Sequence, residues 1–361
     1  MQEEVARGIS RRRLIELAGL GSLAAACGGL SPSATAAPTV AATVAATAAA
    51  TPKTLPKPEK TAIKVGLRLP SLNQQAPMRI AVDKGYFAEV GFTNVEIITT
   101  EQTREGVLGG SLDVAHMETS DMVDAAGNRG TPLRMIAAHS NYTSMMIAVH
   151  KSIRTLKDLE GKDILLGGTP GTKDFDDRAA FLKKAGWDIT TIKVNPVTVP
   201  GGSNAWVKLL SEDKLFMTPI FNRHRNGVLA AGHKLVVDEK VYGSDVLTAS
   251  TAALAQTPNL FVAFIGAYIK ALQIVKDLGN QEYVMGLGPK IGITVTDDIR
   301  NAWELDAANY RPHTGGFPVE DMDGFTKRLF GNAVPVSKFF DPTPLWKAQE
   351  ILGIPKDPPK L

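Results

Sequence analysis

From Ala62 onward, hydrophobic and polar residues follow two periods, one typical of strands and the other of helices. Residues 63–69 alternate as a half-buried strand does, and Pro77 is expected to open an amphipathic helix through Phe87. Further strands are predicted at 94–99, 112–115 and 133–138, with helices at 104–108 and 120–127. Strands that alternate with helices predict a mostly parallel sheet covered by helices.

The same order begins again at Gly161. A strand at 162–166 leads into a glycine-rich turn at 167–172, and a helix is expected from Asp174 to Ala185. Strands at 193–199, 215–218 and 234–238 and a helix at 204–210 complete this second half. An extended segment at 145–149 leads into it, and another at 246–251 leads back. The recurrence favours two similar α/β lobes over one continuous sheet.

The clearest helical pattern follows Thr257, which is expected to be the N-cap, with Pro258 at the first helical position. One face of this helix is apolar: Phe261, Phe264, Ile265, Tyr268, Ile269, Leu272 and Val275. Lys270 and Gln273 interrupt the apolar run, so we expect a core helix and a soluble body. Three more helices are expected near 298–310, 320–330 and 345–352.

The first 26 residues have the features of an export signal. Residues 10–12, Ser-Arg-Arg, resemble the twin-arginine type, and the apolar run at 17–26 is too short to span a bilayer permanently. Residues 23–27 resemble a bacterial lipoprotein cleavage box, with Cys27 as the lipidated residue. That box usually has leucine three residues before the cysteine, where this chain has Ala24. A small buried cysteine in a helical start is the structural alternative.

Residues 27–60 consist almost entirely of Ala, Thr, Pro, Val and Lys after the first few positions. Such a segment buries too little apolar surface to offset its ordering entropy, so we expect a disordered tether between a lipid anchor and the folded body. Cleavage at 34–36 without lipidation is an alternative.

Composition narrows the function classes further. The chain has 361 residues, with 40 Lys and Arg against 37 Asp and Glu. Beyond residues 11–13 the basic side chains stand singly or in pairs, so nucleic-acid binding is not expected. One cysteine excludes an internal disulfide, and a chain of this length can bury a full core without one. We expect a monomer.

Several motifs resemble one known family. Residues 85–92, followed by a strand, and residues 107–115 resemble the opening of the periplasmic solute-binding proteins of the nitrate, sulfonate, taurine and thiamine-pyrimidine precursor type. The resemblance extends to 156–162, 167–172, 248–251 and 259–271, the entry into that family's second lobe and the return to its first. One departure lies in 211–217, where Leu215 replaces the acidic residue of the repeated element.

The resemblance implies an α/β protein of the type II periplasmic-binding-protein fold, with two α/β lobes of mixed sheets joined by two crossover strands. The lobes close on a small ligand, which is delivered to the permease and ATPase subunits of an ABC importer. We then expect an export signal at 1–26, the lipidated tether at 27–60, lobe I at 61–150 and 247–361, and lobe II at 151–246.

Ligands of open α/β sheets lie beyond the carboxyl ends of the strands, where helix N-termini present free N–H groups. This rule selects loops 71–75, 117–120 and 139–142 in lobe I and 169–174, 200–203 and 218–222 in lobe II. The candidate ligand-binding residues are Ser71, Asn73, Gln74, Glu118, Thr119, Ser120, His139, Asn141, Tyr142, Thr169, Gly171, Thr172, Asp174, Gly201, Gly202, Thr218 and Asn222. No catalytic residue, metal or cofactor is expected.

The glycine-rich turn at 167–172 is either an anion nest or an ordinary strand-to-helix turn. It is not a phosphate-binding P-loop, because Lys173 follows Thr172 in place of preceding it. Four acidic residues are expected near the cleft: Glu118, Asp174, Asp176 and Asp177. They count against a doubly charged anion and favour a neutral, zwitterionic or heterocyclic ligand, although Asp174 also suits the first turn of its helix.

Tyr142 and Trp206 are candidates for stacking on a planar ligand or for the core. His116 and Glu118 share a strand face and, with His139, form a weak metal-ligand pattern. An enzyme on the same two-lobe fold, similar to decarboxylases or pyrimidine-synthesis enzymes, and a sensory ligand-binding module are the alternative functions. Missing hydrolase, metalloprotease and dinucleotide motifs, together with the expected anchor, favour a binding protein.

Overall fold

The computed structural model describes residues 54–68 and 71–361. The predicted export signal, Cys27 and most of the predicted tether lie outside the described residues. Residues 54–60, which the sequence assigned to the tether, lie against the folded body. The Glu59 carboxylate accepts hydrogen bonds from the backbone N–H groups of Asn259 and Leu260, at 2.8 and 2.7 Å, and Leu55 packs on the hydrophobic core. The packed body therefore begins before the predicted boundary at residue 61.

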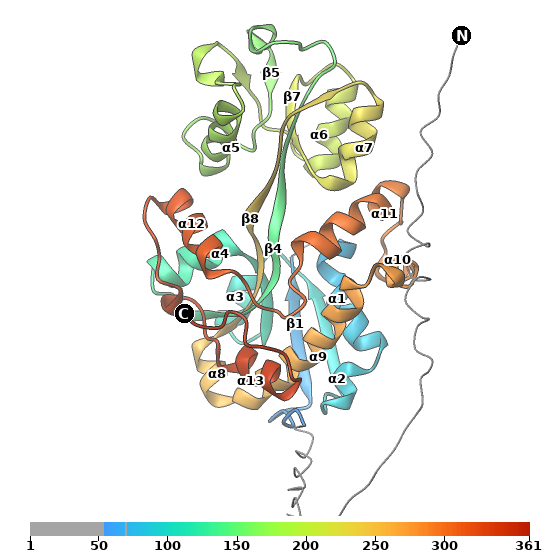
Figure 1. Cartoon of the computed structure of the whole chain (residues 1–361), viewed down its shortest axis with the longest axis vertical. Coiled ribbons are helices and arrows are strands. Elements are labelled where there is room, and N and C mark those ends of the chain that lie inside the picture. Colours follow the sequence, from blue (N-terminus) through green and yellow to red (C-terminus); the bar gives the residue numbers. More distant parts are fainter. Residues whose placement is uncertain (1–53, 69–70) are drawn as a thin grey trace, which may run out of the picture. The chain divides into compact units, whose positions relative to one another are not determined.

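Two strands of 17 residues each, β4 (Leu133–Val149) and β8 (Lys234–Ser250), run antiparallel through the middle of the sheet (Figure 1). The other described strands are β1 (Ala62–Leu67), β2 (Asn94–Thr99), β3 (Val114–Glu118), β5 (Asp163–Ile164), β6 (Asn195–Pro196) and β7 (Met217–Ile220). Their order is β2-β1-β3-β8-β4-β7-β5-β6. Three strands at each end are parallel to one another, and β4 and β8 join the two sets by antiparallel pairing.

The prediction of two lobes in place of one continuous sheet is wrong in one respect, because the hydrogen-bonded ladder is continuous. The segments predicted at 133–138 and 145–149 belong to β4, and those at 234–238 and 246–251 belong almost entirely to β8. The intervening polar residues of β4 looked like a loop. Register shifts near Ala137, Ser140 and Tyr142 let the strand bend without ending. The polar residues at 139–142 are therefore part of the strand and not of a loop.

Helices cover the sheet in the order that the hydrophobic pattern predicted, with several additions. The α-helices are α1 (Leu72–Asp83), α2 (Tyr86–Glu89), α3 (Thr103–Leu108), α4 (Thr119–Met122), α5 (Lys173–Lys184), α6 (Gly202–Ser211), α7 (Asn222–Ala230), α8 (Thr251–Gln256), α9 (Pro258–Lys276), α10 (Gln281–Met285), α11 (Asp297–Glu304), α12 (Val319–Phe330) and α13 (Thr343–Ile351). Two π-helical segments, η1 (Val123–Asn128) and η6 (Leu305–Tyr310), extend α4 and α11. Short 3₁₀ turns are η2 (Leu156–Leu159), η3 (Ile189–Thr191), η4 (Leu278–Asn280), η5 (Pro289–Ile291) and η7 (Val336–Lys338). The sequence did not predict α7, α8 or α10.

The start of α1 also differs from the prediction, because Pro77 lies inside the helix and does not open it. Ser71 is the N-cap, and its hydroxyl oxygen accepts a hydrogen bond from the backbone N–H of Gln74 at 3.2 Å. A serine cap satisfies one of the free N–H groups of the first turn, so the helix begins before the proline.

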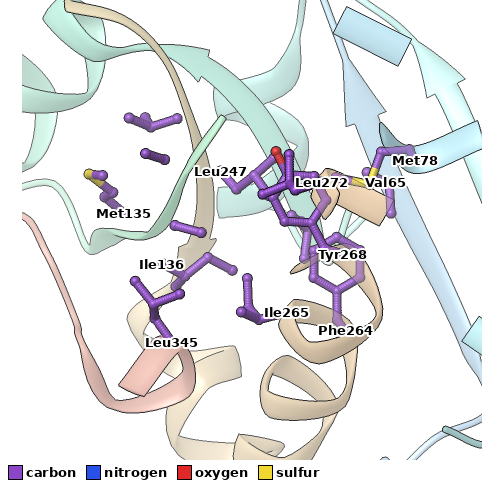
Figure 2. Close-up of a cluster of buried hydrophobic side chains, with 14 of the residues drawn as sticks. Val65, Met78, Met135, Ile136, Leu247, Phe264, Ile265, Tyr268, Leu272 and Leu345 are labelled. Atoms are coloured by element: carbon purple, nitrogen blue, oxygen red, sulfur yellow. The ribbon is translucent and has the colours of Figure 1, made fainter. Parts of the chain in front are cut away.

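The buried apolar residues form one large and two smaller clusters. The large cluster draws its buried members from 63–138 and 242–348 and contains all seven predicted face residues of α9. Figure 2 labels four of these seven, Phe264, Ile265, Tyr268 and Leu272. The smaller clusters draw theirs from 146–241. Among the described helices, α9 is long and apolar enough to cross a membrane, but 72% of its apolar window is buried, as expected for a core helix. The lobe boundaries at 150 and 247 stay a prediction.

Candidate functional site

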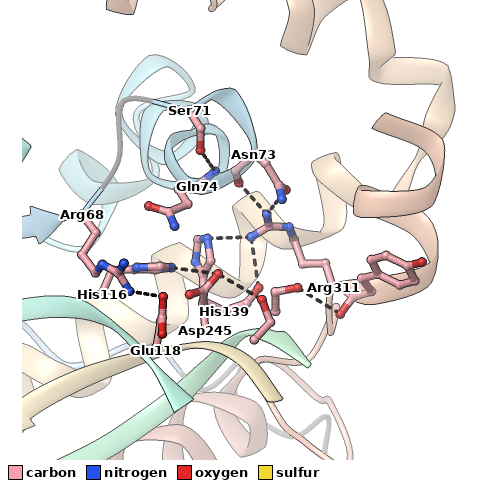
Figure 3. A network of polar contacts seen from close by, with 12 residues as sticks. Arg68, Ser71, Asn73, Gln74, His116, Glu118, His139, Asp245 and Arg311 are labelled. Carbon is pink, nitrogen blue, oxygen red and sulfur yellow. Dashed lines mark hydrogen bonds and ion pairs between the residues drawn. The ribbon is translucent and has the colours of Figure 1, made fainter. Parts of the chain in front are cut away.

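The carboxyl ends of β1 and β3 meet the start of α1 and the middle of β4 and β8 at a group of polar side chains (Figure 3). We call this group the polar cluster; its members are Arg68, Asn73, His116, Glu118, His139, Asp245 and Arg311. The position agrees with the rule that sites of α/β sheets lie beyond strand carboxyl ends. Four members (Asn73, His116, Glu118 and His139) were singled out from the sequence, and three (Arg68, Asp245 and Arg311) were not.

Arg311 is buried and joins α1 to β4. Its Nη1 donates to the Nε2 atom of His139 at 2.9 Å and to the His139 carbonyl oxygen at 3.0 Å. Its Nη2 donates to the side-chain and carbonyl oxygens of Asn73, both at 2.5 Å. No carboxylate of the described residues forms an ion pair with Arg311, and its Nε–H has no acceptor among them. The cluster therefore holds a buried guanidinium whose partners are neutral.

Pro77 explains why the Asn73 carbonyl is free to accept from Arg311. In an α-helix the carbonyl of residue 73 would accept from the N–H of residue 77, and proline has no N–H. The interior proline thus leaves one unpaired acceptor in the first turn of α1, and Arg311 donates to it.

His139 is neutral and both of its ring nitrogens are engaged. Because Arg311 donates to Nε2, that nitrogen carries no proton, so the proton resides on Nδ1, which donates to the Tyr268 hydroxyl at 2.8 Å. Burial, together with the charges of Arg311 and His116, lowers the pKa of His139 well below its ordinary value. His139 therefore has no free nitrogen for a metal, and the described residues contain no group of three or more His, Cys, Asp or Glu placed to hold one.

The other side of the cluster holds two acid–base contacts. Arg68 Nη1 lies 2.5 Å from Glu118 Oε1, and the buried His116 Nε2 lies 3.6 Å from Asp245 Oδ2. Burial opposes the ionisation of Asp245 most strongly, but His116, Ser244 and Arg68 outweigh it and hold the pKa of Asp245 below its ordinary value. Glu118 is thus offset by Arg68 and is not the free negative charge that the sequence suggested.

Residues of the second half reach toward this region through Asn222 at the start of α7. Its amide nitrogen donates to Asp306 at 2.8 Å, and its amide oxygen accepts from the Ser144 hydroxyl at 2.5 Å. Tyr310 in turn lies 2.7 Å from the Ser144 oxygen. Burial raises the pKa of Asp306, while Asn222 and the charges of Arg311 and Arg223 oppose that rise. Asn222, predicted to lie in a loop at 218–222, is instead the first residue of α7 and links that helix to η6 through Asp306.

The residues predicted at 200–203 form the start of α6. Gly201 and Gly202 have φ of +92° and +71°, a conformation that favours glycine. The neighbouring Ser203 hydroxyl accepts from Arg223 Nη2 at 2.7 Å, and Arg223 contributes to the potential at Asp306. Trp206 donates its indole N–H to the Val199 carbonyl at 2.9 Å, which anchors the ring to the segment that precedes α6.

A cleft of about 820 Å³ lies between α4 with η1, α5, and α12. Its lining is Ser120, Asp121, Asp124, Gly171, Asp176, Asp177, Ala180, Phe181, Lys184, Arg328, Leu329 and Phe330. Two predicted residues, Ser120 and Gly171, line it, and Arg328 Nε lies 3.6 Å from Asp177 Oδ1. The cleft thus has apolar walls, four carboxylates and two basic side chains, and it is bounded by segments far apart in sequence.

Several predicted residues have structural partners. The prediction that 139–142 and 218–222 are loops is wrong, because His139, Asn141 and Tyr142 lie within β4 and Thr218 lies within β7. Asn141 is buried and donates to the Gly316 carbonyl at 3.1 Å. Thr218 is fully buried, and its hydroxyl lies 3.3 Å from the Pro219 carbonyl.

Some of the hydrogen-bonding groups of the glycine-rich turn at 167–172 already have partners in the turn itself or in the helix that follows it. The Gly171 N–H donates to Asp176 Oδ1 at 3.1 Å, and the Thr172 hydroxyl donates to the Thr169 carbonyl at 2.7 Å. Asp174 lies in the first turn of α5, as predicted, and also accepts from Arg178 one turn later, at 3.3 Å. A nest with an internal carboxylate on one of its N–H groups is less suited to an external anion.

Gln74 and Thr119 are buried at the starts of α1 and α4. Arg68 follows the same strand-end rule that selected its neighbours, but it precedes the predicted loop, which begins at residue 71. Arg311 had no comparable signal, because a lone arginine after a helix gives no hint of a histidine 172 positions earlier.

Comparisons with known proteins place these features in context. A family profile described as NMT1/THI5 like matches residues 73–278, more than half of the chain. The nitrate/nitrite binding protein NrtA of Nostoc sp. (strain PCC 7120 / SAG 25.82 / UTEX 2576) is 31% identical over 159 residues, which are 42% of this chain and 32% of that relative. The chain therefore matches about a third of the length of that curated relative.

Solved structures resemble the chain in fold. The periplasmic nitrate-binding protein NrtA from Synechocystis PCC 6803 superimposes with a TM-score of 0.60 and 16% identity, covering 84% of this chain and 93% of that one. The desulfurization enzyme DszB superimposes with a TM-score of 0.53 and 13% identity, covering 80% and 99%. The mixed α/β fold is thus the periplasmic-binding-protein fold, as predicted, and this fold also carries an enzyme.

Proposed function

The chain belongs to the NMT1/THI5-like family, and on that premise we propose that it is an extracytoplasmic solute-binding lipoprotein. It captures a small polar or planar organic molecule between two lobes, one formed by 61–150 and 247–361 and the other by 151–246, and delivers it to an ABC importer. The relatives named binding proteins support a solute-binding role at the level of the family and the fold.

The observation that carries the proposal is the cleft between α4, α5 and α12. Ser120 and Asp121 come from one proposed lobe and Gly171 and Asp177 from the other, so a molecule held there would contact both. Its volume of about 820 Å³ is in the range of pockets that enclose small organic molecules. A ligand enclosed between two lobes exchanges water for fixed polar groups and favours the closed arrangement.

The N-terminal sequence supports the location and the partners. An export signal of twin-arginine type at 1–26, lipidation at Cys27 and a tether beyond it would hold a monomeric protein at the outer face of a membrane. A tethered protein that binds and releases a solute suits the permease and ATPase subunits of an importer as partners.

An enzyme is the second candidate, because DszB is an enzyme on the same fold. One measurement separates the two functions: a thermal-shift screen of the full chain against sulfonates, pyrimidines, amino acids, aromatic acids and vitamins, with mass spectrometry of each hit after incubation. A ligand at about a hundred times its dissociation constant adds about 2.7 kcal/mol of stability. A hit recovered intact supports the binding protein, whereas a hit recovered chemically changed supports the enzyme.

A further inference from the structure

The ammonium group of Lys240 lies over the rings of two tyrosines. Lys240 Nζ is 3.8 Å from the centroid of the Tyr142 ring and 5.7 Å from that of Tyr310. The three residues come from different elements, since Tyr142 lies in β4, Lys240 in β8 and Tyr310 at the end of η6. A cation within about 6 Å of a tyrosine centroid is attracted by the negative face of the ring.

Both rings are held in place independently of Lys240. The Tyr142 hydroxyl donates to the Asp321 carboxylate at 2.5 Å, and the Tyr310 hydroxyl bonds Ser144 at 2.7 Å. Tyr242 packs edge-on against Tyr142, with centroids 5.5 Å apart. Burial and the Asp321 carboxylate raise the pKa of Tyr142 to about 12, so the ring is a neutral phenol at ordinary pH. Donation to a carboxylate also increases the electron density that attracts a cation.

Lys240 itself is weakly held. Its side chain is exposed, and no carboxylate of the residues that the structure describes forms an ion pair with it. An exposed ammonium–tyrosine contact changes an equilibrium by only about two- to fivefold. A long, flexible lysine can therefore leave the rings and return to water at small cost.

Each of the two rings is linked to a carboxylate, which favours a cation on the ring face. Asp321 is bonded to Tyr142, and Asp306 is joined to Tyr310 through Asn222 and Ser144. The nearby Arg311 points its donors at Asn73 and His139. Helix α12 supplies both Asp321, which accepts from Tyr142, and Arg328, which lines the cleft, so one helix connects the rings to the cleft.

We infer that Tyr142 and Tyr310 form a recognition box for the ammonium group of the solute, and that Lys240 occupies this box in its place. This inference rests on the proposed solute-binding function and narrows the solute to organic cations and zwitterions. Binding would exchange the lysine ammonium for that of the solute. The rival interpretation is that Lys240 is itself the contact for an anionic solute.

The test is isothermal titration calorimetry of the full chain with tetramethylammonium, n-propylammonium and choline. The uncharged analogue of choline, in which carbon replaces the quaternary nitrogen, is the matched ligand control. The variants are Tyr142→Leu, Tyr310→Leu, Tyr142→Phe and Lys240→Gln, each checked for folding by its melting temperature.

At least one of the cations is expected to bind while the uncharged analogue binds at least about tenfold more weakly. Tyr142→Leu and Tyr310→Leu should each lose most of the affinity, and Tyr142→Phe should retain most of it. Lys240→Gln should bind about two- to fivefold more tightly, because the internal competitor is gone. Tighter binding on removal of a lysine is not expected for a merely structural residue.

Two results would overturn the inference, and they differ in what they say of the proposed function. If sulfonates or carboxylates bind, the cations do not, and Lys240→Gln weakens the anions, the box is wrong and the solute-binding function stands. If neither class binds to the folded full chain or raises its melting temperature, the box falls and the proposed function loses its support as well.

Discussion

At the scale of single residues, the polar cluster depends on how Arg311 is satisfied. A buried guanidinium without a carboxylate is costly unless its donors are used, and here four of its hydrogen bonds go to Asn73 and His139. Asn73, which the sequence predicts as a contact of the solute, is in the structure the acceptor that compensates Arg311. A substitution there affects stability as well as any binding.

Asn73→Ala and Thr172→Ala make a contrasting pair. The first removes an acceptor from a buried charged donor and should cost about 1.5–3 kcal/mol of unfolding free energy. The second removes an exposed local hydrogen bond to Thr169 and should change stability by less than about 0.5 kcal/mol. Urea unfolding of the two apo proteins measures both. If the two substitutions lowered the unfolding free energy equally, the Asn73–Arg311 hydrogen bonds would contribute no more to stability than an exposed local hydrogen bond does.

His224, at the start of α7, is a single residue that is expected to make the stability of the protein depend on pH. Its Nε2 donates to Asn204 at 2.8 Å, and its Nδ1 accepts from the Phe221 N–H at 3.3 Å. Burial, and then the charge of Arg223, lower its pKa to about 4 from the ordinary value of 6.5. The folded protein therefore keeps this histidine neutral at a pH where the unfolded chain takes up a proton.

The stability contributed by neutral His224 is fully present above the unfolded pKa and is lost as the pH falls toward about 4. When the pH falls from about 7 to about 4.5, we expect the unfolding free energy of the parent to drop by about 2 kcal/mol more than that of His224→Gln. This value is reduced for partial solvent screening. Urea midpoints at several pH values measure the difference. Parallel curves for the two proteins would contradict the assignment.

At the scale of elements, much of the fold was predictable because its elements keep their own periodicity. The strands β1 and β2 and the helices α5, α9 and α12 lie where the pattern placed them, whereas β3 starts two residues later than predicted. Two of the failures share a cause: polar residues inside β4 were interpreted as a loop, and Pro77 was interpreted as a helix start. In both cases a residue far away in the sequence pairs with a polar group that has no hydrogen-bond partner nearby in the sequence. Gly316 accepts from Asn141, and Arg311 donates to the Asn73 carbonyl.

The candidate site was predictable only in part for the same reason. Strand ends and helix starts could be read from periodicity, which selected Asn73, Glu118 and Ser120. The groups that complete the site, Arg311 and the α12 wall of the cleft, lie more than 170 residues from those positions along the chain and have no local pattern. No single-sequence rule pairs them.

The N-terminus of helix α9 is capped by a carboxylate from outside the helix, and this cap can be tested. Its N-cap, Thr257, makes no capping side-chain bond, and the Glu59 carboxylate accepts from the first N–H groups instead. Glu59→Ala should cost about 1–2 kcal/mol, because it removes both the cap and a charge favourable to the helix dipole. The matched control is Glu89→Ala, which removes a surface ion pair with Lys270 of the same helix and should cost under about 1 kcal/mol.

At the scale of the whole molecule, the ion pair between Arg328 of α12 and Asp177 of α5 spans the cleft. Arg328 also lies over the rings of Phe181 and Phe325, at 5.4 and 5.7 Å from their centroids. We expect Arg328→Gln to speed hydrogen exchange in α5 more than Asp188→Asn does, since Asp188 pairs with Lys183 away from the cleft. Equal exchange in the two variants would show that the cross-cleft contact does not restrain α5.

The central claim is that a solute binds in the cleft between α4, α5 and α12. The most direct test is calorimetry of the screened solute against two variants of adjacent residues in α5. Ala180→Trp places an indole at a position that lines the cleft and also the neighbouring groove, whereas Ala179 lines that groove alone. The account predicts that Ala180→Trp weakens binding at least about tenfold and that Ala179→Trp leaves it within about twofold. Unchanged affinity in Ala180→Trp, with the protein folded, would contradict it.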